Sequence, residues 1–87
     1  MDKVEIISAL KEIISPYTEE HAVLENINDN TDFIADLKIN SANLVDIVLD
    51  IEERFGITID NDAMAKMLTV SATVEIIKDR LAGDVGQ

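Results

Sequence analysis

Few residues in this chain could do chemistry, and they point away from catalysis. The sequence has no cysteine and a single histidine, His21. It can therefore form no disulfide, thiolate metal site or multi-histidine metal centre. Ser41 stands where a loop is predicted to meet a helix, but a catalytic serine needs a positioned base. His21 has no evident supporting residues for that role, so these residue types disfavour an enzyme.

The carboxylates are the remaining candidate ligands. Two acidic segments resemble calcium-binding loops, and an EF-hand loop requires glycine at its sixth position and glutamate at its twelfth. Counted from Asp60 these positions hold Ala65 and Ser71, and counted from Asn28 they hold Phe33 and Ile39. Neither segment fits, so the sequence predicts no dedicated metal site.

The net charge restricts the partners of the chain. Eighteen acidic and seven basic residues among 87 give a formal charge of −11. Such a surface repels nucleic acid and anionic lipid, and it attracts basic surfaces on other proteins. The longest apolar runs have only three residues, such as Ile47-Val48-Leu49, which argues against membrane insertion. Charged residues interrupt any N-terminal apolar segment, so we expect no signal peptide. We expect a cytoplasmic protein that acts as a monomer through contacts with other proteins.

The hydrophobic pattern predicts one all-α domain over residues 1–87, a four-helix bundle with a long first loop and a short third helix. Helical spacing of apolar residues begins at Val4, and Pro16 should end this helix by disfavouring the helical conformation of Ser15. The second helix should run from Ser41 to Phe55, with Gly56 as its left-handed cap.

Two further helices follow in the expected order. A short segment around Asn61 to Met67 is followed by a helix with Thr69 as N-cap and Gly83 beyond its end. Residues 57–59 alternate like a strand but have no obvious partner. Apolar residues in the long first loop should pin it to the core; they are Leu24, Ile27, Phe33 and Leu37.

The predicted second helix has two distinct faces. Its core stripe consists of Leu44, Ile47, Val48, Ile51 and Phe55. Val45 and Leu49 lie beside this stripe, bordered by the outer carboxylates of Asp46, Asp50 and Glu53. One interpretation is a docking face for a basic partner with an apolar notch. The other is a wide core stripe whose exposed members have no function.

The segment from Phe33 to Val70 resembles the acyl carrier proteins of fatty-acid and polyketide synthesis, which are small acidic four-helix domains. The family's Asp-Ser-Leu signature opens its second helix, and the matching residues here are Asn40-Ser41-Ala42. Three further segments are similar to family patterns: Phe33-Ile34-Ala35-Asp36-Leu37, Glu52-Glu53-Arg54-Phe55-Gly56-Ile57 and Thr69-Val70. The matches follow the family's order along nearly the whole chain.

The resemblance implies a chemistry that the chain itself lacks. A phosphopantetheinyl transferase would move 4′-phosphopantetheine from coenzyme A onto Ser41, and the terminal thiol would then hold an acyl group as a thioester. The domain would catalyse nothing, and it would present the tethered acyl group to acyl-transferring or synthase enzymes with basic docking surfaces. The matching recognition helix, with its outer carboxylates, gives the expected docking residues: Val45, Asp46, Leu49, Asp50, Glu52 and Glu53.

Three positions depart from the family pattern. Asn40 replaces an aspartate, Ala42 replaces a leucine, and Lys38 replaces a common glycine. Asparagine still caps a helix, but a negative charge is lost where transferase contacts are expected. Alanine removes an apolar group from either the core entrance or the docking face. The departures favour a specialised carrier with its own transferase or partners, and they leave open that Ser41 is not modified.

The cargo and one alternative class also stay open. Fatty acyl, polyketide, aminoacyl and D-alanyl carriers share this architecture. Peptidyl carriers rank lower, because Lys38-Ile39-Asn40 precede Ser41 in place of their Gly-Gly-[His/Asp]. An unmodified acidic helical adaptor would work through protein contacts alone. The intact mass after co-expression with a broad-specificity transferase distinguishes this adaptor from a carrier.

Overall fold

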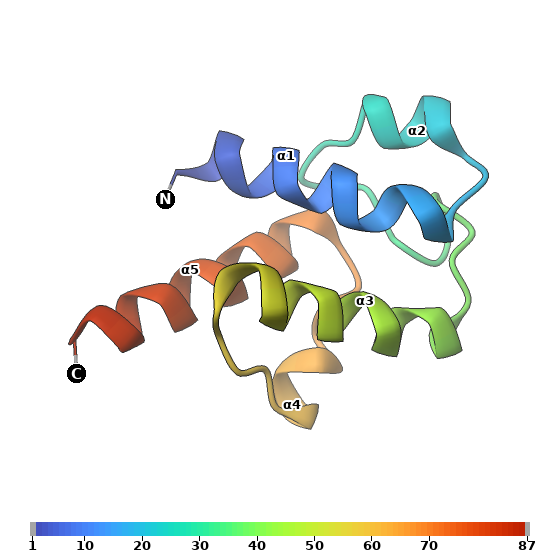
Figure 1. Ribbon diagram of the computed structural model, residues 1–87. Helices are drawn as coiled ribbons and strands as arrows, with labels where there is room; N and C mark the ends of the chain where they lie inside the picture. The colour runs from blue at the N-terminus through green and yellow to red at the C-terminus, as the bar shows by residue number, and fades with distance from the viewer. Residues whose placement is uncertain (1, 87) are drawn as a thin grey trace.

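The chain folds into helices joined by loops. The computed structural model describes residues 2–86. Its elements are α1 (Lys3–Ile14), the 3-10 helix η1 (Ser15–Tyr17), α2 (His21–Glu25), α3 (Ser41–Phe55), α4 (Asn61–Met64) and α5 (Val70–Gly86). Helix α1 packs against both α3 and α5 (Figure 1). The described residues contain no strand, only an isolated bridge between Asp32 and Thr69, so the predicted all-α class is confirmed.

Aliphatic side chains build the core between the three long helices. The predicted stripe of α3 is buried, with Ile51 fully inaccessible and Phe55 half-buried at its end. The long connection before α3 also supplies core residues, as expected. Leu24, Phe33 and Leu37 are buried and Ile27 is partly buried, and Phe33 is the largest fully buried side chain. The connection is therefore part of the packed structure.

Helix α3 begins and ends where the sequence predicts. Asn40 is its N-cap, and its side chain accepts a hydrogen bond from the Asn43 N–H at 2.9 Å. Gly56 ends the helix in the left-handed conformation with φ of +66°, which glycine adopts without steric cost. Both helix ends thus have the local interactions that their residue types favour.

Several other boundaries differ from the predictions. Ser15 keeps a helical conformation, because Pro16 is accommodated in the first turn of η1, where no N–H is needed. Helix α4 ends at Met64, three residues early, and α5 continues through Gly83 to Gly86. The long connection also contains η1 and α2, which are too short to show a helical period.

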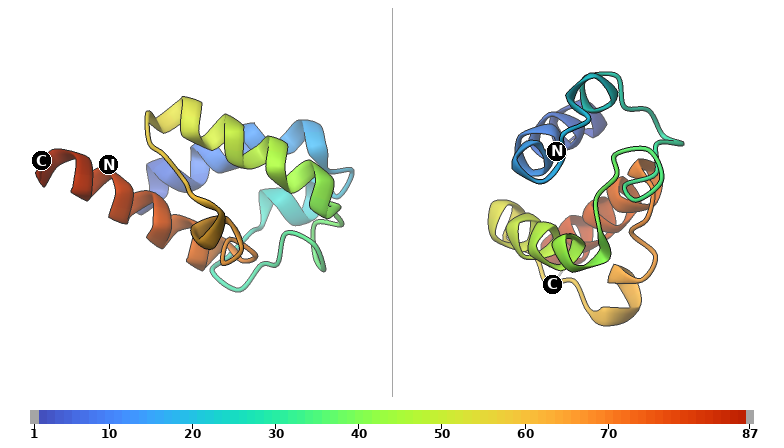
Figure 2. Two further views of the ribbon diagram at one scale, coloured as in Figure 1. Left: turned by 90° about the horizontal axis from the view of Figure 1, so that it is seen from below. Right: turned by 90° about the vertical axis from the view of Figure 1, so that its right-hand side faces the viewer.

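Backbone hydrogen bonds attach the α2–α3 connection to the start of α5 (Figure 2). The Val70 N–H donates to Thr31 O at 3.0 Å, and the Phe33 N–H donates to Leu68 O at 2.9 Å. The Ser71 N–H donates to Asp29 O at 3.1 Å. Thr69 caps α5, since its hydroxyl accepts from the Ala72 N–H at 3.2 Å, as predicted. The route of the chain into α3 is therefore fixed by α5.

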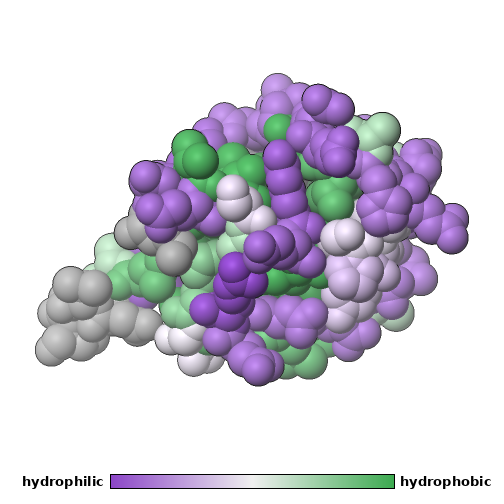
Figure 3. Space-filling model, turned by 45° about the horizontal axis from the view of Figure 1, so that its top comes forward, coloured by the Kyte–Doolittle hydropathy of each residue, from purple (hydrophilic) through white to green (hydrophobic). Residues whose placement is uncertain are grey.

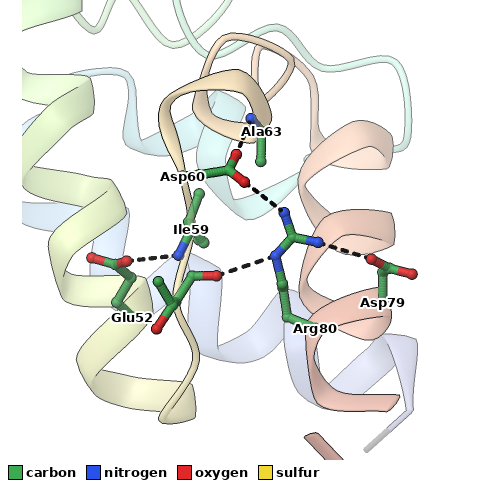
Figure 4. Close-up of polar contacts among 7 residues, drawn as sticks. Glu52, Ile59, Asp60, Ala63, Asp79 and Arg80 are labelled. Atoms are coloured by element: carbon green, nitrogen blue, oxygen red, sulfur yellow. Dashed lines mark hydrogen bonds and ion pairs between the residues drawn. The ribbon is translucent and has the colours of Figure 1, made fainter. Parts of the chain in front are cut away.

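The α3–α4 loop is held from both sides by charged side chains (Figure 4). The Glu52 carboxylate of α3 accepts a hydrogen bond from the Ile59 N–H at 2.7 Å. From α5, the Arg80 guanidinium donates to Thr58 O at 3.1 Å and lies 3.7 Å from the Asp60 carboxylate. Asp60 in turn caps α4 by accepting from the Ala63 N–H at 2.8 Å. Charge-assisted bonds of this kind fix the position of α4.

The surface is mainly hydrophilic. Figure 3 shows polar residues over most of one face, with hydrophobic residues in scattered patches. The ion pairs of Lys3 with Asp29 and of Arg54 with Glu12 are exposed, and such pairs contribute little stability. Across the described range, every helix is too short or too polar to serve as a membrane span.

Thr73 offers a test of core packing. Its side chain is fully buried in α5, and its hydroxyl has no hydrogen-bond partner among the described residues. We expect Thr73→Val to raise the free energy of unfolding by about 1 kcal/mol, because an unpaired buried hydroxyl is removed at nearly constant volume. Thr18→Val is the matched control and should lower it, since the Thr18 hydroxyl donates to Leu37 O at 2.6 Å. Urea unfolding measures both, and stabilisation by both variants would contradict this account.

Glu52 and Glu53 are neighbours on α3 with different structural roles. Glu52→Ala should lower the free energy of unfolding by about 1–3 kcal/mol, because the Ile59 N–H loses its charged acceptor. Glu53 is exposed, so Glu53→Ala should change stability by less than about 0.5 kcal/mol. Chemical denaturation gives both values, and amide hydrogen exchange at Ile59 should accelerate only in the Glu52 variant. Equal effects of the two variants would show that the bond does not hold the loop.

Candidate functional site

The candidate attachment serine lies at the exposed start of α3. Ser41 is the first helical residue and follows the Asn40 cap. The first N–H groups of a helix lack intrahelical acceptors and carry partial positive charge, so a phosphate ester on this serine is electrostatically favoured. Its side chain is exposed, which leaves the hydroxyl accessible to a modifying enzyme. The local geometry thus fits a phosphopantetheine group.

Ala42 is also exposed, next to Ser41. The leucine that the family has at this position would therefore belong to the docking face and not to the entrance of the core. A larger side chain here would extend the outer surface of α3 and would not enter the core. The alanine therefore alters the surface around Ser41.

The segment before Ser41 has an unusual backbone. Lys38 has φ of +57°, a left-handed conformation that costs a residue with a side chain about 1 kcal/mol relative to glycine. The Leu37 carbonyl accepts the 2.6 Å hydrogen bond from Thr18, and the Ile39 N–H donates to Phe33 O at 3.1 Å. The sequence showed only that Lys38 replaces a glycine common in the family. It did not predict the left-handed conformation of Lys38.

The outer face of α3 displays the predicted apolar pair. Val45 is 44% exposed and Leu49 is 56% exposed, although both are aliphatic. Asp46 and Glu53 are exposed on the same helix. The structure thus brings two apolar side chains together with two carboxylates that form no ion pair with the described residues, all on the helix that begins with Ser41.

Asp50, another predicted docking residue, forms a hydrogen bond within the protein. It is half-buried, and its carboxylate accepts a hydrogen bond from the Tyr17 hydroxyl at 2.9 Å. This bond, desolvation and the negative charges of Asp50 and Asp46 raise the pKa of Tyr17 above its ordinary value of 10.0. These effects favour the neutral phenol, whose hydroxyl donates the bond. The bond therefore joins η1 to α3 at neutral pH, and it is lost as the pH rises through the raised pKa of Tyr17.

Glu52 has a structural partner as well, because its carboxylate holds the Ile59 N–H. Sequence reasoning included it among the docking residues and did not identify this contact, which joins residues seven positions apart. It also missed two exposed apolar side chains outside the long helices. Ile34 and Leu68 are each 41% exposed, on segments joined by the backbone bond from Phe33 to Leu68. Helical periodicity cannot identify residues in such irregular segments.

The remaining candidates for chemistry are dispersed. His21 is exposed in α2, beside a hollow lined by residues such as Lys11, Ser15 and Glu25. No hydrogen bond joins it to Ser41 within the described residues. In the same part of the chain, no group of three or more histidine or acidic residues is arranged to hold a metal ion.

Comparisons with known proteins agree with this geometry. Residues 8–77 match the family model described as "Phosphopantetheine attachment site". The chain is 35% identical over 78 residues to an acyl carrier protein of Lactobacillus acidophilus, covering 90% of this chain and 95% of that protein. It is 37% identical over 78 residues to an acyl carrier protein of Thermotoga maritima, covering 88% and 93%.

Solved structures show the same fold. The crystal structure of an acyl carrier protein from Thermotoga maritima superposes with a TM-score of 0.81 at 23% identity, covering 95% of this chain and 94% of that one. An acyl carrier protein from Enterococcus faecalis gives 0.76 at 26% identity, covering 92% and 99%. The predicted acyl-carrier-like architecture is therefore confirmed. Together with the family model and the sequence identities, these likenesses show that the chain belongs to the acyl carrier protein family, whose members bear phosphopantetheine.

Proposed function

We propose that Ser41 is the attachment residue for 4′-phosphopantetheine and that the protein carries acyl intermediates in fatty-acid, polyketide or related lipid biosynthesis. The observation that supports this most is the exposed Ser41 hydroxyl at the first position of a capped α3, inside the family match over residues 8–77. When attached, the group supplies a thiol for the acyl thioester, which a chain without cysteine cannot supply itself. The protein is a carrier and not an enzyme.

The chain itself provides the acceptor hydroxyl and its positioning. Asn40 fixes the first turn of α3, so Ser41 stays at a defined place on the surface. In the described part of the chain, no side chain forms a hydrogen bond with the Ser41 hydroxyl. The base that accepts the serine proton must therefore come from the transferase. The exposed position of Ser41 fits an external catalyst.

The partner enzymes bind the outer face of α3 in this proposal. They comprise a phosphopantetheinyl transferase and acyl-transferring or synthase enzymes with basic docking surfaces. Asp46 and Glu53 are free to meet basic side chains and steer encounter, while Val45 and Leu49 fill an apolar notch. Asp50 and Glu52 border this face, but their bonds to Tyr17 and Ile59 give them less freedom to turn toward a partner.

Modification of Ser41 is tested by intact mass. The protein, incubated with coenzyme A and a broad-specificity phosphopantetheinyl transferase, should gain one phosphopantetheine, and Ser41→Ala should gain none. Ser71→Ala is the matched control and should be modified like the parent. Mass gain by the Ser41 variant would refute the assignment, and an unmodified parent would favour the acidic adaptor.

The docking face is tested by charge reversal. Asp46→Lys combined with Glu53→Lys should slow modification at least severalfold at low salt and weaken its salt dependence, because encounter with a basic enzyme depends on these charges. Glu75→Lys combined with Asp79→Lys makes the same change in net charge on α5 and should have a small effect. Leu49→Ala should slow transfer at every salt concentration. If the α5 pair causes equal damage, the docking face is not on α3.

A further inference from the structure

Lys38 has a backbone conformation that its residue type does not favour. Within residues 2–86 it is the only non-glycine residue with positive φ, at +57°. A side chain in this left-handed region approaches the following carbonyl, a contact that glycine avoids. Strained positions of this kind persist where the surrounding structure fixes them, and they point to a functional role of the side chain.

The neighbours of Lys38 impose this conformation. Leu37 is fully buried and its carbonyl is bonded to the Thr18 hydroxyl, while Ile39 is 1% exposed and bonded to Phe33 O. These contacts fix the chain on both sides, so any residue at position 38 must turn the same way. The Lys38 side chain is exposed and adds nothing to the core. Fold stability therefore does not explain a lysine here.

Lys38 also carries its charge without an ion-pair partner, as three other lysines of the described residues do. Lys3, Arg54 and Arg80 form ion pairs, whereas no carboxylate of the described residues lies within ion-pair distance of Lys38. Its side chain borders a hollow that it shares with Tyr17, Glu19 and Glu20. It thus places a free positive charge three residues before Ser41, in a chain of net charge −11.

A positive charge at this position changes the binding of partner enzymes in opposite directions, according to the charge that each enzyme presents around the serine. An enzyme that modifies many acidic carriers must present basic side chains around the serine that it receives, and like charges facing each other across an interface are strongly unfavourable. An enzyme with a carboxylate on the same rim gains an attraction. One residue can therefore separate two classes of partner by repulsion as well as by attraction.

We propose that Lys38 is a specificity-determining residue of the carrier site, which disfavours enzymes with a uniformly basic rim and favours an enzyme that presents a carboxylate there. The proposal rests on the assignment of Ser41 as the attachment residue. It requires only that a bound partner encloses the turn before α3, which leads directly into Ser41 (Figure 1).

The test separates charge from backbone strain. Lys38→Gln removes the charge, Lys38→Glu reverses it and Lys38→Arg keeps it, and all three retain a side chain at the strained position. Modification by a broad-specificity transferase, followed by intact mass at low salt, should be about threefold to tenfold faster for the Gln variant and faster again for Glu. Arg should match the parent. The gain should lie in KM and should largely vanish above about 0.3 M salt, where the Debye length falls to about 6 Å.

Two controls decide the interpretation. Lys78→Gln removes an exposed lysine of α5 and should leave the rate unchanged. Lys38→Gly should raise the thermal unfolding midpoint, because strain is relieved, whereas Arg and Gln should not differ from each other. The inference is overturned if Lys38→Gln is no faster than the parent, or if Lys78→Gln gives an equal gain. If neither the parent nor any variant gains mass, the attachment assignment itself fails, and specificity at Lys38 fails with it.

Discussion

The attachment of the α2–α3 connection to the start of α5 is the constraint on which the site depends. Three backbone hydrogen bonds join residues 29–33 to residues 68–71, and Phe33 is buried directly beside them. A buried backbone group without a partner is costly, so the paired connection cannot shift without losing several bonds together. This fixes the entry into α3, because Leu37 and Ile39, further along the same connection, are buried as well. Ser41 thereby lies at a defined point of the surface although it follows a long loop.

The acidic residues of α3 divide into two groups by their contacts. Asp50 and Glu52 are half-buried and bind groups of the chain itself, the Tyr17 hydroxyl and the Ile59 N–H. Asp46 and Glu53 are exposed and keep their charges available to solvent and partners. Exposed charges contribute little to stability but affect the rate of encounter, whereas charged hydrogen bonds to buried groups hold the structure. The charges that hold the structure thus lie on other residues of the helix than the charges of the docking face that we propose.

Sequence reasoning was most accurate where local interactions decide the structure. The bounds of α3 follow from the Asn40 cap, the Gly56 terminus and a strong helical period, and all three lie within one segment. It failed where the deciding contact is tertiary or the element is short. Pro16 fits a 3-10 turn, α2 has only five residues, and α5 tolerates Gly83 within the helix. Helical periodicity was enough to place Val45 and Leu49 on the exposed face. It could not predict the partners of Asp50 and Glu52, because these partners lie in other elements of the fold.

The turn before α3 combines buried residues that fix the backbone with exposed residues that can vary while the fold is retained. The conformation of Lys38 is determined by the buried residues on either side of it and by the hydroxyl of Thr18, which is buried as well. The side chains at Lys38, Asn40, Ser41 and Ala42 are all exposed, so each can change with little effect on core packing. Only the cap of Asn40 links one of them to helix stability, and aspartate would provide the same bond. Because the buried framework and the exposed residues alternate along so short a segment, the charge around Ser41 can be altered one residue at a time without displacing the serine.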